Sequence, residues 1–112
     1  MASSKLGKRA SDLISDPENQ LYMSAVSWWE LGLKRALGKL DADLTGARRD
    51  FERRGVVAVA VTLEHGEAAA ALPVLHRDPF DHMLVAQALS EGLRLLTRDK
   101  FLERYGPTVM CV

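Results

Sequence analysis

The fold is decided by the stretch Asp78-Pro79-Phe80-Asp81-His82-Met83-Leu84-Val85-Ala86-Gln87-Ala88. Asp78 suits the N-cap of a helix, Pro79 suits its first turn, and Asp81 follows three residues after the cap. Gly92 suits the end of the same helix. The apolar residues of this segment share one helical stripe, formed by Phe80, Leu84 and Ala88 with Val85 and Leu89 at its flanks. The stretch therefore predicts a helix that packs one apolar face against a core.

Outward from this helix, strands and helices alternate along the chain. Residues 56–61 form a continuous apolar, β-branched run, which suits a strand covered on both faces as in a parallel sheet. The other expected strands are 20–24, 93–96 and 109–112. The other expected helices are 5–15, one that begins after Ser24 or Ser27 and ends at Gly38, 43–53, 62–71 and 99–105. This alternation predicts an α/β sandwich with a mainly parallel sheet.

The bulk properties favour one ordinary globular domain over residues 1–112, with 47% hydrophobic and 27% charged residues. The formal net charge is zero, which argues against a tight general nucleic-acid binder but allows an enzyme with a local basic rim. The single cysteine, Cys111, excludes a disulfide within the chain and fits a reducing cytoplasm. No apolar run reaches membrane-spanning length, and residues 1–5 lack the apolar core of a signal peptide. We therefore expect a soluble, cytoplasmic protein with no membrane partner.

Three acidic residues occupy related places in this pattern. Glu30 lies in the first turns of the helix after strand 20–24, Asp81 lies in a first helical turn, and Asp99 directly follows strand 93–96. Right-handed crossovers bring such helix starts and strand ends to one edge of the sheet. Converging carboxylates repel one another and need a cation, for which Mg²⁺ or Mn²⁺ is the natural choice. Such a site suits phosphodiester hydrolysis.

Each of these acids also has a purely structural interpretation. Ser27 and Glu30 have the spacing of a capping box, and Asp81 is a residue that any well-capped helix carries. Asp99 could simply cap the helix expected at 99–105. Pattern alone therefore leaves two possibilities open, an acidic metal site and a set of helix caps.

Four segments resemble the PIN-domain nucleases of the VapC toxin type. Residues 24–31 resemble the stretch that carries the second acid of that family, and residues 35–40 resemble the segment that follows it. Residues 72–88 are similar to the third motif, and residues 95–99 to the fourth. The resemblance runs from about Leu6 to the C-terminus, with the motifs in the same order and spacing. It implies a PIN-like three-layer sandwich and a metal-dependent endoribonuclease, the toxin of a toxin–antitoxin pair and a homodimer.

The resemblance also implies roles for individual residues. Glu30, Asp81 and Asp99 would be catalytic ligands of Mg²⁺ or Mn²⁺, and Asp78 would be an accessory acid or, as we favour, a helix cap. Polar groups that would orient carboxylates or water are Ser27, Thr97 and Asp78. Candidates for contacts with RNA phosphates, each equally well explained as solvated charge, are Lys34, Arg77, Arg98 and Lys100. His76 and His82 flank the third motif, and neither is expected to be a ligand because Mg²⁺ does not select imidazole.

One feature of the family has no counterpart here. Its members normally begin with a short apolar strand that ends in an aspartate, the first metal ligand. Nothing before Glu30 matches it, since Asp12 and Asp16 lie in or after a helical segment. We therefore expect a truncated domain whose first central strand is missing, with two strand edges unpaired. A wrong start position is the favoured explanation, and the others are a decayed gene or a strand supplied by another chain.

A second function follows from the same expectation. A catalytically impaired, truncated domain could still bind the antitoxin and sequester it. Trp28, Trp29, Leu33 and Leu37 lie on one helix that could line a groove for an amphipathic antitoxin helix. The favoured interpretation is that Trp29, Leu33 and Leu37 belong to the core. Trp28, about 100° around the helix from Trp29, would then be the more exposed.

Overall fold

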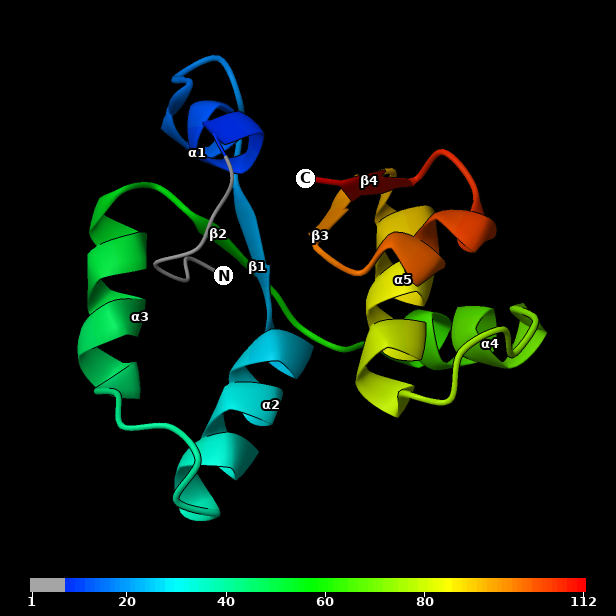
Figure 1. Cartoon of the computed structure of the whole chain (residues 1–112), viewed down its shortest axis with the longest axis horizontal. Helices are drawn as coiled ribbons and strands as arrows, with labels where there is room; N and C mark the ends of the chain where they lie inside the picture. The colour runs from blue at the N-terminus through cyan, green and yellow to red at the C-terminus, as the bar shows by residue number, and fades with distance from the viewer. Residues whose placement is uncertain (1–7) are drawn as a thin grey trace. The chain divides into compact units, whose positions relative to one another are not determined.

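The structure, a computed structural model, describes residues 8–112 (Figure 1). Its elements are α1 (Lys8–Ser15), β1 (Tyr22–Ser24), α2 (Ala25–Ala36), α3 (Leu44–Arg53), β2 (Val57–Val59), α4 (Leu63–Ala71), α5 (Pro79–Glu91), β3 (Leu95–Thr97), the 3₁₀ helix η1 (Lys100–Tyr105) and β4 (Val109–Cys111). The alternation expected from the sequence is confirmed. The expected start of the first helix at residue 5 and the expectation for residues 1–5 lie outside the described residues.

The strands form two parallel pairs. In the first pair Tyr22 lies opposite Val57, and in the second Leu95 lies opposite Val109. The parallel α/β class is therefore confirmed. Within residues 8–112 these pairs are two separate two-stranded sheets. β1 is hydrogen-bonded only to β2, and β3 only to β4.

The described chain divides into two compact units. Unit 1 holds residues 8–19 and 63–112, and unit 2 holds residues 20–62. Unit 1 contains α4, α5, η1 and the β3–β4 pair, while unit 2 contains α2, α3 and the β1–β2 pair. The acids expected from the sequence are thus divided, with Glu30 in unit 2 and both Asp81 and Asp99 in unit 1.

Each helix of unit 2 begins with an N-cap side chain. The Ser24 hydroxyl accepts a hydrogen bond from Val26 N at 3.0 Å, and an Asp43 carboxylate oxygen accepts one from Gly46 N at 3.0 Å. Such caps satisfy amide groups that the first helical turn leaves without a partner. Of the two serines considered for the first of these helices, Ser24 is therefore the N-cap of α2.

The apolar face of α2 differs from the expectation. Trp28 packs edge-to-face on Phe51 of α3, with ring centroids 5.7 Å apart. Trp29 is 62% exposed, Leu37 is 69% exposed, and Leu33 lies on the same exposed stripe. The prediction that Trp29, Leu33 and Leu37 form the core was therefore wrong. The helix α2 carries apolar residues on two faces. The face with Trp28 packs on Phe51 of α3, whereas the face with Trp29, Leu33 and Leu37 stays exposed.

Strand β2 also differs from the expectation of a strand covered on both faces. Val57 is 44% exposed and Ala58 is exposed as well. β-Branched residues favour an extended backbone by themselves, whereas burial of their faces requires other layers to pack over them. In unit 2 the helix α2 contacts β1, and β2 presents Val57 to solvent.

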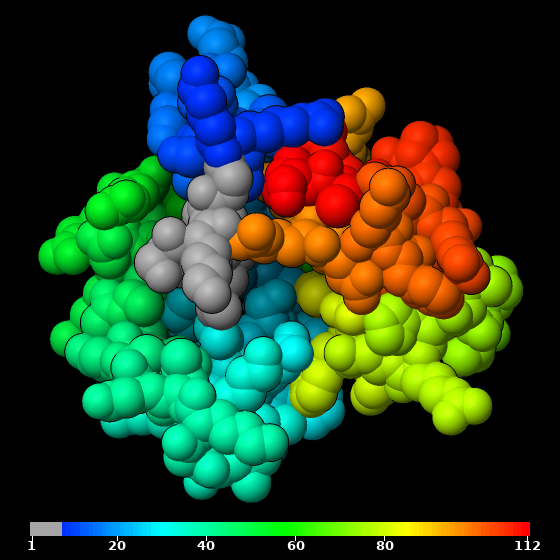
Figure 2. All heavy atoms as spheres, in the orientation of Figure 1, coloured from blue at the N-terminus to red at the C-terminus, as the bar shows by residue number. Residues whose placement is uncertain are grey.

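The core of unit 1 lies between α5, η1 and β4. Val85, Leu102 and Val109 are buried together, and Leu95 and Tyr105 pack against them. Gly92 ends α5 in the left-handed conformation with a φ of 66°, as predicted. The predicted inward stripe was only partly right: the buried residues of α5 are Val85, Ala86, Gln87 and Ala88, while Phe80 and Leu84 are half-buried and Leu89 is exposed. The C-terminal residues (red) lie beside the orange β3–η1 segment in Figure 2.

A buried histidine joins α4 to α5. His65 is 1% exposed, and its Nε2 donates a hydrogen bond to Glu91 Oε1 at 2.7 Å. Its Nδ1 lies 3.4 Å from Gln87 Nε2, which donates to it. Both ring nitrogens thus have partners on α5, which offsets the cost of burying a polar ring.

A second histidine joins the same helices to η1. His82 Nε2 donates to the Ala69 carbonyl oxygen at 2.7 Å, and His82 Nδ1 lies 3.4 Å from the Tyr105 hydroxyl. Because Nε2 carries the proton, Nδ1 accepts from the Tyr105 hydroxyl, which itself accepts a hydrogen bond from Leu75 N at 3.0 Å. The segment before α5 is therefore tied to η1 through Tyr105.

Replacing His65 by alanine should destabilise the fold. The variant His65→Ala leaves a cavity and removes an acceptor of the buried Gln87 amide, so the free energy of unfolding should fall by about 2–3 kcal/mol. Glu67→Ala, on the exposed side of the same helix, should change it by less than about 0.5 kcal/mol. Urea unfolding of both variants measures the difference. Equal stability of the two would contradict the bridging role of His65.

Candidate metal centre at His76, Asp81 and Asp99

The start of α5 is built by Asp78. Its Oδ1 accepts hydrogen bonds from Phe80 N at 2.9 Å and Asp81 N at 3.4 Å, and Pro79 is the first helical residue. The predicted N-cap at Asp78 is therefore confirmed. The cap sets Asp81 in the first turn, where the partial positive charge of the helix end favours a carboxylate.

Asp99 is positioned by the turn that follows β3. Its backbone N donates to Thr97 Oγ1 at 3.0 Å, and its Oδ1 accepts from Phe101 N at 3.0 Å. Asp99 is thus the N-cap of η1, as the structural interpretation of the sequence proposed. The cap engages Oδ1 and leaves Oδ2 to face other groups. Thr97 acts on Asp99 through the backbone amide.

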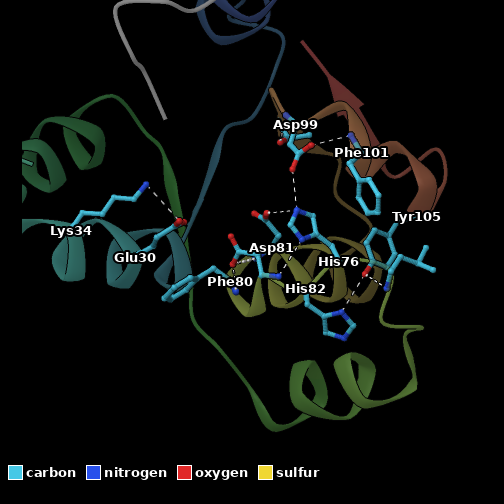
Figure 3. A network of polar contacts seen from close by, with 12 residues as sticks. Glu30, Lys34, His76, Phe80, Asp81, His82, Asp99, Phe101 and Tyr105 are labelled. Atoms are coloured by element: carbon cyan, nitrogen blue, oxygen red, sulfur yellow. Dashed lines mark hydrogen bonds and ion pairs between the residues drawn. The ribbon is translucent and has the colours of Figure 1, made fainter. Parts of the chain in front are cut away.

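His76 lies between the two aspartates (Figure 3). Its Nε2 is 3.1 Å from Asp99 Oδ2 and 3.7 Å from Asp81 Oδ2. Its Nδ1 accepts a hydrogen bond from Asp78 N at 3.1 Å. The ring also meets Phe101 edge-to-face, with centroids 5.2 Å apart. The imidazole therefore bridges the segment before α5 and the turn after β3.

The three side chains form a cluster whose chemistry fits a divalent cation. One ligand atom from each of His76, Asp81 and Asp99 lies within 4.8 Å of the others, and all three residues are half-buried. Carboxylate oxygens are the ligands that hard divalent cations prefer, and two neighbouring carboxylates repel until a positive charge or a donor lies between them. In this structure His76 Nε2 faces both carboxylates, where an imidazole N–H would be such a donor.

Sequence reasoning missed the part that His76 plays. It considered the residue only as a ligand and set it aside for that reason. The available signal was position, because His76 lies two residues before the N-cap and so at the same end of α5 as Asp81.

The third expected acid belongs to unit 2. Glu30 is on α2, where it forms an ion pair with Lys34 at 3.7 Å (Figure 3). The capping-box interpretation of Glu30 was wrong, because Ser24 is the N-cap and Ser27 already lies within the helix. The convergence of Glu30 with Asp81 and Asp99 stays a prediction, as does the polar role of Ser27.

The expected phosphate contacts lie on the surface. Arg77 is next to His76, and Arg98 and Lys100 flank Asp99, and all three side chains are exposed. Lys34 is also exposed but pairs with Glu30. Their contacts with RNA stay predictions. Among the described residues, no helix combines the length and the apolar character that a membrane span requires.

Comparisons with known proteins give one finding. Neither the curated proteins nor the solved structures contain a match. The family model of the PIN domain matches residues 1–106, a range that includes Glu30 and both aspartates of the cluster. This match covers nearly the whole chain and agrees with the parallel α/β fold. The chain therefore belongs to the PIN domain family.

Proposed function

We propose that this chain is a metal-dependent endoribonuclease, the toxin of a toxin–antitoxin pair, and that residues 1–112 form a single PIN domain. PIN domains are generally nucleases and typically use divalent metals. The observation that carries the proposal is the cluster in unit 1, where Asp81 and Asp99 meet from α5 and from the turn after β3. Glu30 of α2 is the proposed third ligand.

The proposed cation is Mg²⁺ or Mn²⁺, held by carboxylate oxygens. When bound, such an ion activates water and stabilises negative charge on a phosphate. The chain's own residues fix the geometry. Asp78 sets the register of α5 and with it the place of Asp81, while Thr97 and Phe101 hold the backbone and one oxygen of Asp99.

Local charge supports RNA as the substrate. A chain of zero net charge cannot attract RNA through its overall field, so phosphate binding has to come from neighbouring cations. Arg77, Arg98 and Lys100 are exposed and lie next in sequence to the residues of the cluster. Contacts of this kind position the backbone of a nucleic acid without reading its sequence.

Removing a proposed ligand should abolish cleavage. Asp81→Asn and Glu30→Gln keep the size of each side chain but remove its charge, so the rate of RNA cleavage with Mg²⁺ or Mn²⁺ should fall by about 100-fold or more, equivalent to ~2.7 kcal/mol in the activation barrier. The assay follows a labelled RNA that carries a single fluorophore. The matched control is Asp50→Asn, which removes the charge of an α3 acid that is paired with Arg53 and Arg54.

The outcomes separate the proposal from a contaminating nuclease. Asp50→Asn should cleave at the rate of the unchanged chain, and EDTA should stop cleavage by both. Cleavage that survives EDTA, or that is equal in Asp81→Asn and the unchanged chain, would rule out the proposed site. Loss of cleavage in Asp81→Asn, together with full cleavage in Glu30→Gln, would exclude only Glu30 from the proposed ligands.

A second candidate function, a protein-binding module, is favoured by the exposed stripe of α2. Trp29, Leu33 and Leu37 are spaced four residues apart, so they lie on one helical face, and each is exposed. Aromatic and aliphatic residues on one face suit the apolar side of an amphipathic helix. The antitoxin is the proposed partner of this face. The proposed homodimer would also bury an exposed apolar face.

The stripe can be tested without disturbing the core. Trp29→Ala should weaken binding of the protein encoded by the adjacent gene by about 10-fold or more, because buried tryptophans carry much of the energy of such interfaces. Leu63→Ala, a strongly exposed position on α4, is the control and should leave the affinity unchanged. Both affinities can be measured by calorimetric titration with the purified partner. Equal affinities would exclude the stripe as the binding face.

A further inference from the structure

We infer that His76 aims the carboxylates of the cluster as a hydrogen-bond donor and does not itself ligate the cation. The inference rests on the proposed function, because it concerns the metal site of that nuclease. It assigns a positioning role to a residue whose ring nitrogen lies within 4.8 Å of a carboxylate oxygen of both Asp81 and Asp99. The contacts of the ring and of its neighbours support it.

The hydrogen bond at Nδ1 fixes the position of the ring proton. Asp78 N is 3.1 Å from Nδ1 and can only donate, so Nδ1 must present a lone pair. A neutral imidazole then carries its proton on Nε2. Nε2 is the nitrogen that faces Asp99 Oδ2 at 3.1 Å, and a carboxylate there can only accept. Both contacts of the ring agree on one tautomer.

That tautomer excludes a metal bond through the nearer nitrogen. A histidine ligand needs a lone pair on the nitrogen that binds the metal. If Nε2 gave up its proton in a neutral ring, the proton would move to Nδ1, where it would point at the amide hydrogen of Asp78. The Asp78 amide would then lose its acceptor at the very residue that caps α5.

The ring is held so that its N–H points at Asp99. Phe101 packs edge-to-face on the His76 ring at an interplanar angle of 83°. The Phe101 ring is itself covered by the Arg104 guanidinium, which lies 4.2 Å from its centroid. Phe101 N also donates to Asp99 Oδ1. Each oxygen of Asp99 therefore receives one fixed donor, and the lone pairs that remain on both oxygens are directed by them. Donors of this kind orient metal ligands from behind.

Asp81 is the weaker partner of the ring. Its Oδ2 lies 3.7 Å from Nε2, a distance that is too long for a hydrogen bond. The position of Asp81 comes mainly from the helix start. His76 therefore acts chiefly on Asp99 and brings that carboxylate toward an acid that α5 has already placed.

The other two histidines provide an internal reference. His82 Nε2 faces the Ala69 carbonyl oxygen and must carry a proton, and His65 Nε2 faces Glu91 in the same way. All three rings are thus expected as the Nε2–H tautomer. Only His76 has this proton directed at the proposed metal ligands, so only its signals should respond to a cation.

Nitrogen NMR of the full chain tests the inference directly. Long-range ¹⁵N–¹H spectra distinguish the two tautomers, and the His76→Gln variant identifies the His76 signals by their loss. We expect the Nε2–H form of His76 without metal and, after addition of Mg²⁺, a shifted signal that keeps its Nε2 proton. The His82 signals should stay unchanged. An Nδ1–H form, or loss of the Nε2 proton on addition of Mg²⁺, would overturn the inference.

The same spectra separate failure of this inference from failure of the proposed function. No response of His76 to saturating Mg²⁺, together with a flat calorimetric titration, would contradict the proposed metal site and the part of the inference that depends on it. The tautomer of the metal-free chain would still decide whether His76 is the donor to Asp99. Nuclease activity does not enter either result.

Variants give an independent measure of the positioning role. His76→Ala removes the donor and should weaken Mn²⁺ binding by roughly 10- to 100-fold, whereas His76→Gln keeps an N–H of similar reach and should restore most of the affinity. Glu67→Gln, an exposed position on α4 outside the cluster, is the control and should bind Mn²⁺ within about twofold of the unchanged chain. Water-proton relaxation measures the affinities, and thermal unfolding checks that each variant is folded. Equal Mn²⁺ affinity of His76→Ala and the unchanged chain would overturn the inference.

Discussion

Asp78 makes hydrogen bonds in two directions, and the geometry of the cluster depends on both. Its carboxylate accepts from Phe80 N and Asp81 N, which fixes where α5 begins, and its own amide donates to His76 Nδ1. A cap of this kind contributes only about 1 kcal/mol to stability. Its main effect is on geometry. The same residue places Asp81 in the first turn of α5 and orients the imidazole of His76. Asp78 therefore serves the site without having to touch a cation.

The packing of unit 1 supports this arrangement from behind. Leu75, just before His76, is bonded to the Tyr105 hydroxyl at the end of η1, and Tyr105 is bonded in turn to His82 of α5. The segment before α5 is thus joined to the chain that follows β3 at two places, to Asp99 through His76 and to Tyr105 at the end of η1 through Leu75. A site held by such supporting contacts keeps its geometry before any ligand arrives, which is what precise binding requires.

The features that could be predicted from sequence are those that a few neighbouring residues determine. The cap at Asp78 and the end of α5 at Gly92 follow from local chemistry, and each was found where expected. The choice between Trp28 and Trp29 as the packed residue depended instead on Phe51 of α3, which periodicity in α2 cannot reveal. His76 was missed for a different reason. From sequence it was considered only as a metal ligand, whereas in the structure its Nδ1 accepts from Asp78 N and its Nε2 faces Asp99 Oδ2.

Charge at the cluster follows from the order of residues in two short segments. His76 and Arg77 precede Asp78, and Arg98 and Lys100 enclose Asp99, so acids and bases alternate where the segments meet. At physiological salt, charges on the surface act over about 8 Å, so such near neighbours matter more than the net charge of zero. In the proposed nuclease, the acids would attract a small cation inside the cluster while the exposed bases would attract phosphates around it. A chain of zero net charge would in this way present both halves of the proposed phosphodiester site.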